Sequence, residues 1–404
     1  PRADIPVGII LSRDADAWIR EDEIPTVTFT DANGKPLTIK EGRGKNAKVR
    51  EITGPAIALP LYQGVAIWQM NSSSADYCGG ATHSARWDRR EHYEASLPGP
   101  QFLAGVSVAA STNPESVRTR VGFRAVQNAT NRRTMIASLL PACPAGNSLA
   151  ILRTDPERTP LLPPYLSDLA YDFSLRPRMS QANLNWFIIA ETPIPKYQPT
   201  KLLRRLRQLS LGLTTPYPPC STVWLGLHEA TYTPWRSHWK VTDHERARSV
   251  ITCNVLALFS RGLCPDDLGV VVHNCDHPVA VLQNRTFVDS LDAKGFWRVD
   301  KDKPPEQRLT VLSLVAFHDL QNKVNECGGD VEKGIESFCT QNDGEGWMLP
   351  DKLRLADYGL GQDERAQHPQ PVRECFGPRF YDWQLAQSPE ESWRECHLHA
   401  RNLL

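Results

Sequence analysis

The stretch from Arg118 to Pro141, RTRVGFRAVQNATNRRTMIASLLP, is the part of the chain on which the expected fold depends most. Its first part, RTRVGFRAV, favours a β-strand, because β-branched and aromatic residues are enriched in strands. Successive side chains of a strand point to opposite faces, so alternate residues share one face. The residues that we expect to share a face, as a basic stripe, are Arg118, Arg120, Gly122 and Arg124.

The second part of this stretch, NRRTMIASLL, has the spacing of an amphipathic helix. Thr130 or Asn131 could cap that helix, because short polar side chains accept hydrogen bonds from the first backbone amides. The free amides at such an N-terminus also suit a phosphate group.

The same stretch is rich in the side-chain types that contact nucleic acids. Arginine pairs with phosphate and guanine, asparagine and glutamine pair with adenine, and threonine takes either role. A solvated, charged strand edge followed by a well-capped helix is the other interpretation, and the residues alone leave both open. The side chains concerned are Arg118, Arg120, Arg124, Gln127, Asn128, Thr130, Asn131, Arg132, Arg133 and Thr134.

The overall composition restricts the class of protein. The chain has 404 residues, with 46 basic and 46 acidic side chains, so its formal net charge is zero. This balance argues against a protein that coats nucleic acid indiscriminately, although a locally basic groove is compatible with it. No apolar run approaches the roughly 18 residues that a membrane-spanning helix needs. We therefore expect a cytoplasmic protein of two or three domains.

The cysteines do not indicate a metal site. Ten cysteines lie singly along the chain, and no C-x-x-C pair occurs. This dispersion fits reduced cytosolic thiols better than a disulfide framework or a zinc ribbon. The densest candidate ligand group, Cys396-His397-Leu398-His399, is better explained as an ordinary helix end, because no second ligand pair stands near it in the sequence.

Strand-like and helical segments alternate up to about residue 197, which predicts an α+β domain with a curved, mixed sheet. The chain starts at Pro1 rather than Met, and we expect it to begin partway through something longer.

A proline-punctuated linker, ETPIPKYQPT (191–200), separates this domain from a helical region. The segment TKLLRRLRQLSLGL then places leucines on one helical face, with Arg204, Arg205 and Arg207 around the rest. We expect a long helix over residues 242–263, capped by Thr242 or Asp243, and two more near 306–324 and 330–339.

No catalytic motif is recognisable. The run LLPPYLSD (161–168) contains the Pro-Pro-Tyr of amino-group methyltransferases, but Leu162 stands where the essential Asn or Asp should be. We interpret Pro163-Pro164 as a turn ahead of a helix that starts around Tyr165. The glycine-rich run DYGLG (357–361) lacks a convincing strand before it and an apolar helix after it, so a cofactor loop is not indicated. We predict no catalytic, cofactor-binding or metal-binding residue in this chain.

Several segments, in order, resemble the C-terminal half of type IIG restriction–modification enzymes and of related BREX- or DISARM-like phage-defence N6-adenine DNA methyltransferases. The resemblance extends from about Pro60 to the C-terminus, and its specificity lies in the ordered series. The segments are PLYQGVAIWQMN (60–71), residues 118–141, residues 165–195, ERARSVITCNVLALFSRGLCPDDL (245–268), residues 295–320 and residues 341–366.

The proline-punctuated linker and the change of composition along the chain divide it into a connector (1–55), a mixed-sheet domain (56–197), a helical region (198–340) and a polar C-terminal tail that packs on the body (341–404). The resemblance implies that residues 56–197 are a target-recognition domain and that residues 198–340 are a helical spacer. It also implies that the cofactor S-adenosylmethionine binds to a methyltransferase core that lies N-terminal to this region, in the same or a separate chain. The implied partners are double-stranded DNA, that core and other defence-system proteins.

The resemblance also carries over to individual positions. Two sets match the family: Arg124, Asn131, Arg133 and Thr134 in the recognition domain, and Asp172, Arg176 and Asn185 before the Pro-x-Pro segment. The family pattern leaves open whether these residues are structural or face DNA. The chain departs from the family in the spacer helix, which usually has an acidic pair before a Tyr-Gly-Leu. The matching positions here are Thr252, Asn254 and Arg261-Gly262-Leu263, so the resemblance does not carry over any inter-domain salt bridge of that pair.

Two functions remain open. The first is sequence-specific DNA recognition, with the DNA-binding residues Arg118, Arg120, Arg124, Asn128, Asn131, Arg132, Arg133, Thr134, Arg204, Arg205 and Arg207. The alternative is a docking subunit of a multi-protein defence complex without direct DNA readout, because Trp and Arg are favoured at interface centres. Its predicted anchors are the exposed tryptophans Trp224, Trp235 and Trp239.

Overall fold

The computed structural model describes residues 25–402, except 32, 43–46, 57, 82–83, 91–96, 113–118, 180–181, 196–199 and 227–232. It contains 46% helix and 16% strand, which confirms the predicted α+β class. Arg118 lies outside the described residues.

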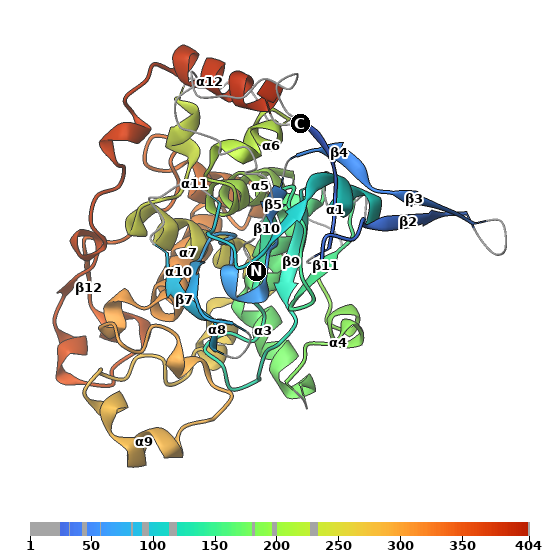
Figure 1. Ribbon diagram of the computed structural model, residues 1–404. Coiled ribbons are helices and arrows are strands. Elements are labelled where there is room, and N and C mark those ends of the chain that lie inside the picture. The colour runs from blue at the N-terminus through green and yellow to red at the C-terminus, as the bar shows by residue number, and fades with distance from the viewer. Residues whose placement is uncertain are drawn as a thin grey trace.

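A three-stranded antiparallel sheet lies at the centre of the molecule (Figure 1). Strand β9 (Arg120–Arg124) runs between β10 (Ala137–Leu140) and β11 (Leu149–Leu152). Val121 and Phe123 point to the face that packs on helices, whereas Leu140 and Leu149 share a cluster with Tyr62 and Ile67 on the other face. Because both faces are covered, β9 is a buried strand rather than a charged edge.

The helix predicted for NRRTMIASLL is wrong. Residues 131–136 form a loop, and the following residues form strand β10, which pairs with β9 in the register Ala137↔Phe123 to Leu140↔Arg120. Every residue from Arg133 to Pro141 is buried. A short, continuously apolar run fits a strand that is buried on both faces as well as it fits a helix, so periodicity could not separate the two.

The remaining sheets are two-stranded, and all the strand pairs are antiparallel, where a mixed sheet was expected. Among the described residues, parallel pairing occurs at one isolated bridge, between Tyr62 and Ala145. The pairs are β1 (Thr26–Thr28) with β4 (Thr53–Pro55), β2 (Thr38–Glu41) with β3 (Lys48–Glu51), β5 (Ala58–Pro60) with β8 (Leu103–Gly105), β6 (Ala75–Gly79) with β7 (Arg86–Arg89), and β12 (Lys352–Leu353) with β13 (Gln370–Pro371).

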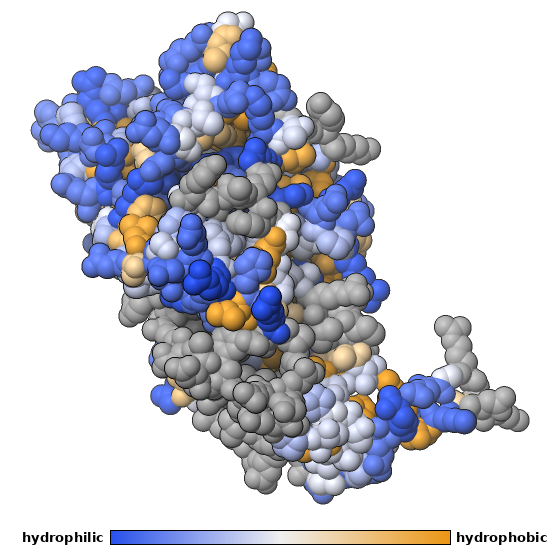
Figure 2. Space-filling view, turned by 90° about the horizontal axis from the view of Figure 1, so that it is seen from above, coloured by the Kyte–Doolittle hydropathy of each residue, from blue (hydrophilic) through white to orange (hydrophobic). Residues whose placement is uncertain are grey.

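Strands β2 and β3 form an arm that projects from the body (Figure 1). All four residues of β3 are exposed, and the arm's surface is mainly hydrophilic (Figure 2). A turn at Asn33-Gly34 precedes this arm. Gly34 adopts a φ of 79°, and the Asp31 carboxylate accepts hydrogen bonds from the backbone amides of Asn33 (2.8 Å) and Lys35 (3.0 Å).

Helices α5 (Thr200–Thr214), α7 (Asp243–Ser260), α10 (Leu309–Glu326) and α11 (Val331–Thr340) confirm the four helices predicted after residue 198. Helix α7 is almost wholly buried, and it packs against α5 and α10. The Thr242 hydroxyl caps α7 by accepting a hydrogen bond from the Glu245 amide at 3.1 Å, as predicted. Gly262, with a φ of 75°, follows the end of the helix.

The Pro-Pro-Tyr sequence lies inside a helix. Helix α2 (Leu162–Ser167) has both prolines near its N-terminus, where a missing amide hydrogen costs no intrahelical bond. Helix α3 (Leu169–Leu175) follows at once, with Asp168 as its N-cap. The helix therefore starts at Leu162, earlier than the expected start around Tyr165.

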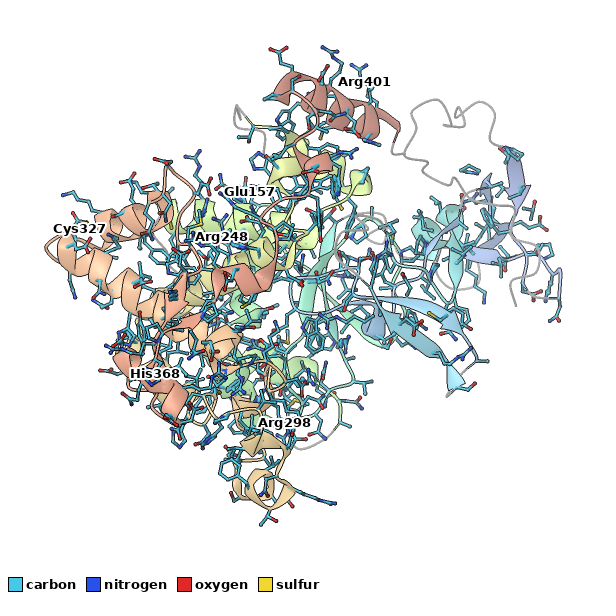
Figure 3. All side chains as sticks on the ribbon, turned by 90° about the vertical axis from the view of Figure 1, so that its left-hand side faces the viewer. Glu157, Arg248, Arg298, Cys327, His368 and Arg401 are labelled. Carbon is cyan, nitrogen blue, oxygen red and sulfur yellow. The ribbon has the colours of Figure 1, made fainter. Side chains whose placement is uncertain are left out.

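The other helices are short, apart from the last. They are α1 (Val106–Thr112), α4 (Trp186–Glu191), α6 (Ser221–Leu225), α8 (Pro265–Val271), α9 (Arg285–Ser290) and α12 (Pro389–Asn402). Helix α12 lies at one edge of the molecule, with Arg401 near its end (Figure 3). No helix among the described residues is both long enough and apolar enough to cross a membrane.

The hydrophobic clusters cross the boundaries drawn at 197/198 and 340/341. The largest cluster joins Met70 and Tyr165 to residues of α5, α7, α10 and the tail, including Phe376. A second cluster joins Val121 and Phe123 to Trp235 and Trp393. An ion pair of 2.7 Å between Arg261, after α7, and Asp168, before α3, also connects the two regions.

Candidate nucleic-acid interface

A buried ion-pair network lies beneath the loop that connects β9 to β10. The Asp172 carboxylate, on α3, has no exposed surface and lies 3.0 Å from the Nε atoms of both Arg133 and Arg176. It also accepts hydrogen bonds from the backbone amide of Thr134, at 3.1 and 3.2 Å. Asp172 and Arg176 are one helical turn apart, which brings their side chains together. The Arg176 guanidinium lies over the Phe296 ring, 3.9 Å from its centroid.

This network fixes the backbone of the loop. The Nη2 atom of Arg176 donates hydrogen bonds to the carbonyls of Asn131 (3.2 Å) and Arg132 (2.9 Å). Its Nη1 atom donates to the carbonyls of Lys294 and Gly295, in the segment before α10. The loop is thereby attached to two distant parts of the chain.

Bonds within the loop complete its shape. The Asn128 side chain accepts a hydrogen bond from the Thr130 amide at 3.0 Å, and the Asn131 side chain donates to that of Gln127 at 2.7 Å. The backbone amide of Gln127 donates a hydrogen bond to the backbone carbonyl of Ala182 at 3.0 Å. Residues 127–134 therefore have a conformation that the surrounding structure determines.

The loop presents amide, hydroxyl and guanidinium groups to solvent. Asn128, Thr130, Asn131 and Arg132 are exposed. The Arg132 side chain, 52% exposed, forms an ion pair of 3.0 Å with Asp302, which is 70% exposed. A pair with this exposure contributes little to stability, so the Arg132 guanidinium can exchange its partner for a phosphate or a base at small cost.

The predicted basic stripe on β9 is wrong. Arg120 and Arg124 do share a face, but that face is covered, and their guanidinium groups donate to internal carbonyls. Arg120 is buried and donates to Cys143, while Arg124 is half-buried and donates to Ile67 (3.1 Å) and Val65 (3.2 Å). Burial lowers the pKa of Arg124 to about 10, so it stays protonated at neutral pH.

Arg133 and Thr134 are not at the surface either, so the prediction that they contact DNA is wrong for both. Arg133 is buried, donates to the Ser167 carbonyl and pairs with Asp172. Burial is the main cause that lowers its pKa. The Thr134 hydroxyl donates to the Asn128 carbonyl at 3.3 Å. Both residues support the loop from below, where a DNA phosphate cannot reach them.

The three spacer arginines on α5 differ in their surroundings. Arg204 is exposed. Arg205 donates to the Glu345 carbonyl in the tail, and burial lowers its pKa. Arg207 donates to the Glu157 carbonyl at 2.9 Å; Glu157 is labelled beside α5 in Figure 3. Arg205 and Arg207 thus attach α5 to neighbouring segments.

An open cleft of about 360 Å³ lies beside the end of β9. Gly64 is required at its wall, because a Cβ atom there would lie 2.6 Å from the Ser148 carbonyl oxygen. The cleft has no signal in the local sequence, because its residues come from separate segments with no common motif. The lining residues are Gln63, Gly64, Val65, Ala85, Trp87, Gln101, Arg124, Val126 and Ser148.

The tryptophans predicted as docking anchors are buried, so that prediction is wrong. Trp224, Trp235 and Trp239 are 6%, 0% and 1% exposed. Trp235 and Trp239 pack edge to face, with ring centroids 4.9 Å apart, and hold the tail through Trp383 and Trp393. The large aromatic side chains that are exposed on helices are Phe173 on α3 and Trp186 and Phe187 on α4.

Comparison with known proteins assigns no family. No family model matches the chain, and no solved structure matches it. The chain is similar to the Sec-independent protein translocase protein TatA of Bartonella quintana (strain Toulouse), with 38% identity over 68 residues. This match covers 17% of the chain and 66% of that protein.

Proposed function

We propose that this chain is the sequence-specific DNA-recognition region of an N6-adenine DNA methyltransferase in a restriction–modification or phage-defence system. The observation that carries the proposal is the loop at 127–134, whose exposed Asn128, Asn131 and Arg132 stand on the buried Asp172 network. The resemblance of the ordered segments points to the same function. A cytoplasmic location accords with it.

A loop of this kind suits base recognition. Asparagine can bond to adenine through two groups at once, and arginine can do the same with guanine. Ordering a flexible loop on binding costs free energy, and this loop is ordered before it meets a partner. The hydrogen bonds from Arg176 to the carbonyls of Asn131 and Arg132 hold the backbone from which these two side chains extend.

Methyl transfer itself belongs to the methyltransferase core that the resemblance implies. That core would bind S-adenosylmethionine and transfer its methyl group to adenine N6. The role of this chain is to bind duplex DNA and to select the sequence.

The test is selection of duplexes from a random pool by the 404-residue chain, followed by binding measurements on the enriched sequence. We expect Asn131→Ala and Arg132→Ala to weaken binding by about 5- to 150-fold and to relax the preference at one or two base pairs. Arg158→Ala is the matched control, because Arg158 is 77% exposed and lies outside the loop. Binding should also weaken steeply with salt. A pool without enrichment, or equal binding by all three variants, refutes the proposal.

A second candidate function is favoured by the exposed aromatic side chains of α3 and α4. Phe173, Trp186 and Phe187 are 47%, 52% and 60% exposed, and such groups are typical of protein interfaces. A docking subunit of a defence complex would use this surface and would show little binding to DNA at any salt concentration.

A further inference from the structure

We infer that the cleft beside Arg124 is a binding site for a single unstacked nucleobase. The inference rests on the proposed function and extends it, because it assigns a second kind of contact to a second site. The cleft, of about 360 Å³, is at the small end of the range for ligand pockets. That size suits one base or nucleoside rather than a larger cofactor.

Trp87 gives the cleft an aromatic wall. It lies on β7 directly opposite Tyr77 of β6, and the two rings pack edge to face with centroids 5.6 Å apart. Tyr77 thereby fixes the orientation of the indole. Stacking on an aromatic side chain tolerates any base, because every base has a π face.

The cleft also carries amide groups that match the edges of bases. Gln63 and Gln101 line it, and among the described residues neither side-chain amide has a hydrogen-bond partner. Each amide offers a donor and an acceptor, the combination needed to bond to the edge of a purine or pyrimidine. The Ser148 hydroxyl, which accepts a hydrogen bond from the Gly64 amide at 3.0 Å, lies on the same wall.

The charge of the cleft favours a nucleotide. Arg124 contributes a cation that is protonated at neutral pH, held at 5.3 Å from the centroid of the Trp68 ring. The described lining contains no carboxylate that would repel a phosphate. A base inside the cleft would therefore leave its phosphate near a positive charge.

The cleft and the recognition loop are adjacent along the chain. Val126, 63% exposed, lines the cleft and pairs in an isolated bridge with Asn183. The next residue, Gln127, begins the loop that presents Asn128, Asn131 and Arg132. A DNA strand bound to the loop passes beside the cleft, so an unstacked base from that strand can enter it.

The test uses the selected duplex with 2-aminopurine placed at successive positions, because this base becomes fluorescent when it leaves the stack. We expect binding to raise the fluorescence at one position. Trp87→Ala should remove the rise and weaken binding by about 5- to 150-fold, whereas Trp87→Phe should keep most of both. Leu385→Ala is the control, because Leu385 is 51% exposed and does not line the cleft. Thermal melting of each variant establishes that it is folded.

The outcomes separate the inference from the proposed function. Salt-dependent binding of the duplex, without a fluorescence rise at any position, overturns the inference and leaves DNA recognition standing. If no duplex is bound, nucleoside monophosphates are tested alone. Their binding, lost in Trp87→Ala, supports a nucleobase site that serves free nucleotides, and it refutes DNA recognition. Failure to bind either ligand overturns both.

Discussion

The carboxylate of Asp172 has no exposed surface, yet its pairing with Arg133 and Arg176 determines what the surface above it presents. Arg133 and Thr134, which the sequence predicts to contact DNA, belong to this buried support. The exposed Asn131 and Arg132 directly precede Arg133 in the chain, and Arg176 of the same network donates to their backbone carbonyls. Neighbouring residues therefore differ in their surroundings, because Arg132 is exposed and Arg133, the next residue, is buried.

The local sequence could not distinguish these roles. Arginine is almost never fully buried unless it is paired, so a cluster of arginines is read as exposed. Here Arg120, Arg124 and Arg133 find carbonyls or a carboxylate far along the chain, such as Cys143 and Asp172. Those partners are brought together by the fold and leave no local signal. Asn128, Asn131 and Arg132 were predicted as site residues and do lie at the surface.

Replacement of Asp172 with asparagine is expected to lower the free energy of unfolding by about 3 to 5 kcal/mol, because it leaves two buried guanidinium groups without a counter-charge. Urea unfolding of Asp172→Asn beside the unaltered chain measures the change. Asp302→Asn is the control, since its exposed pair with Arg132 should contribute no more than about 1 kcal/mol. A loss below about 1 kcal/mol for Asp172→Asn would contradict a structural role.

At the scale of elements, the long helices were predictable and the sheet was not. Helix α7 has an N-cap at Thr242 and a glycine at its end, and α5 has leucines on one face; both signals are local. The pairing of β10 with β9 depends on what covers the sheet. Strand and helix are equally compatible with the apolar run at 135–140, because burial on both faces removes the alternation that marks a strand.

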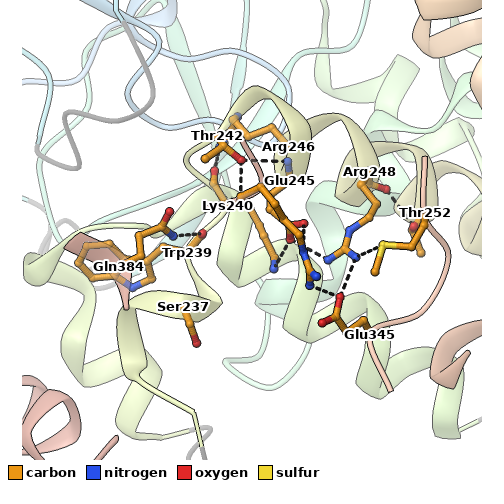
Figure 4. A network of polar contacts seen from close by, with 12 residues as sticks. Ser237, Trp239, Lys240, Thr242, Glu245, Arg246, Arg248, Thr252, Glu345 and Gln384 are labelled. Atoms are coloured by element: carbon orange, nitrogen blue, oxygen red, sulfur yellow. Dashed lines mark hydrogen bonds and ion pairs between the residues drawn. The ribbon is translucent and has the colours of Figure 1, made fainter. Parts of the chain in front are cut away.

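Helix α7 and the tail are joined by a cluster of charges (Figure 4). Glu245 pairs with Lys240 (2.9 Å), Arg248 (2.7 Å) and Arg379 (3.3 Å), and Arg379 also pairs with Glu345. The Thr242 hydroxyl donates to the Arg379 carbonyl at 2.9 Å. Desolvation acts to raise the pKa of Glu245, but Lys240 and Arg248 outweigh it and lower the pKa to about 2.

This depressed pKa predicts an acid-dependent loss of stability. Glu245 titrates near 4.5 when unfolded and near 2 when folded, so its contribution is complete above about pH 4.5 and disappears as the pH falls through 2. The contribution is about 3 kcal/mol. Urea unfolding between pH 2 and 6 gives the free energy of unfolding at each pH, and this free energy should fall less steeply toward low pH in Glu245→Gln than in the unaltered chain. Glu326→Gln, at a side chain 60% exposed, should leave that pH dependence unchanged. The same pH dependence in Glu245→Gln and in the unaltered chain would rule out this linkage.

At the scale of the molecule, the regions expected from the resemblance share their cores. Tyr165 and Leu169 of the recognition region pack in one cluster with α7 and with Phe376 of the tail. Arg261, just after α7, connects the recognition region to the helical region through its ion pair with Asp168. Composition at a proline-rich linker carries no signal of such contacts, because they join residues far apart in the chain, such as Asp168 and Arg261.

Shared cores predict that the chain unfolds as one unit. Circular dichroism, which follows the helices, and tryptophan fluorescence should give the same midpoint in urea. Removal of residues 341–404 should abolish the cooperative transition, because it strips Trp347, Leu349 and Phe376 from one cluster and Trp393 from the other. The control replaces residues 40–49 of the β2–β3 arm with Asn-Gly. Because the described residues of the arm belong to neither cluster, the urea midpoint of this variant should equal that of the unaltered chain. Two separate transitions, or a shortened chain with its midpoint retained, would show instead that the regions fold independently.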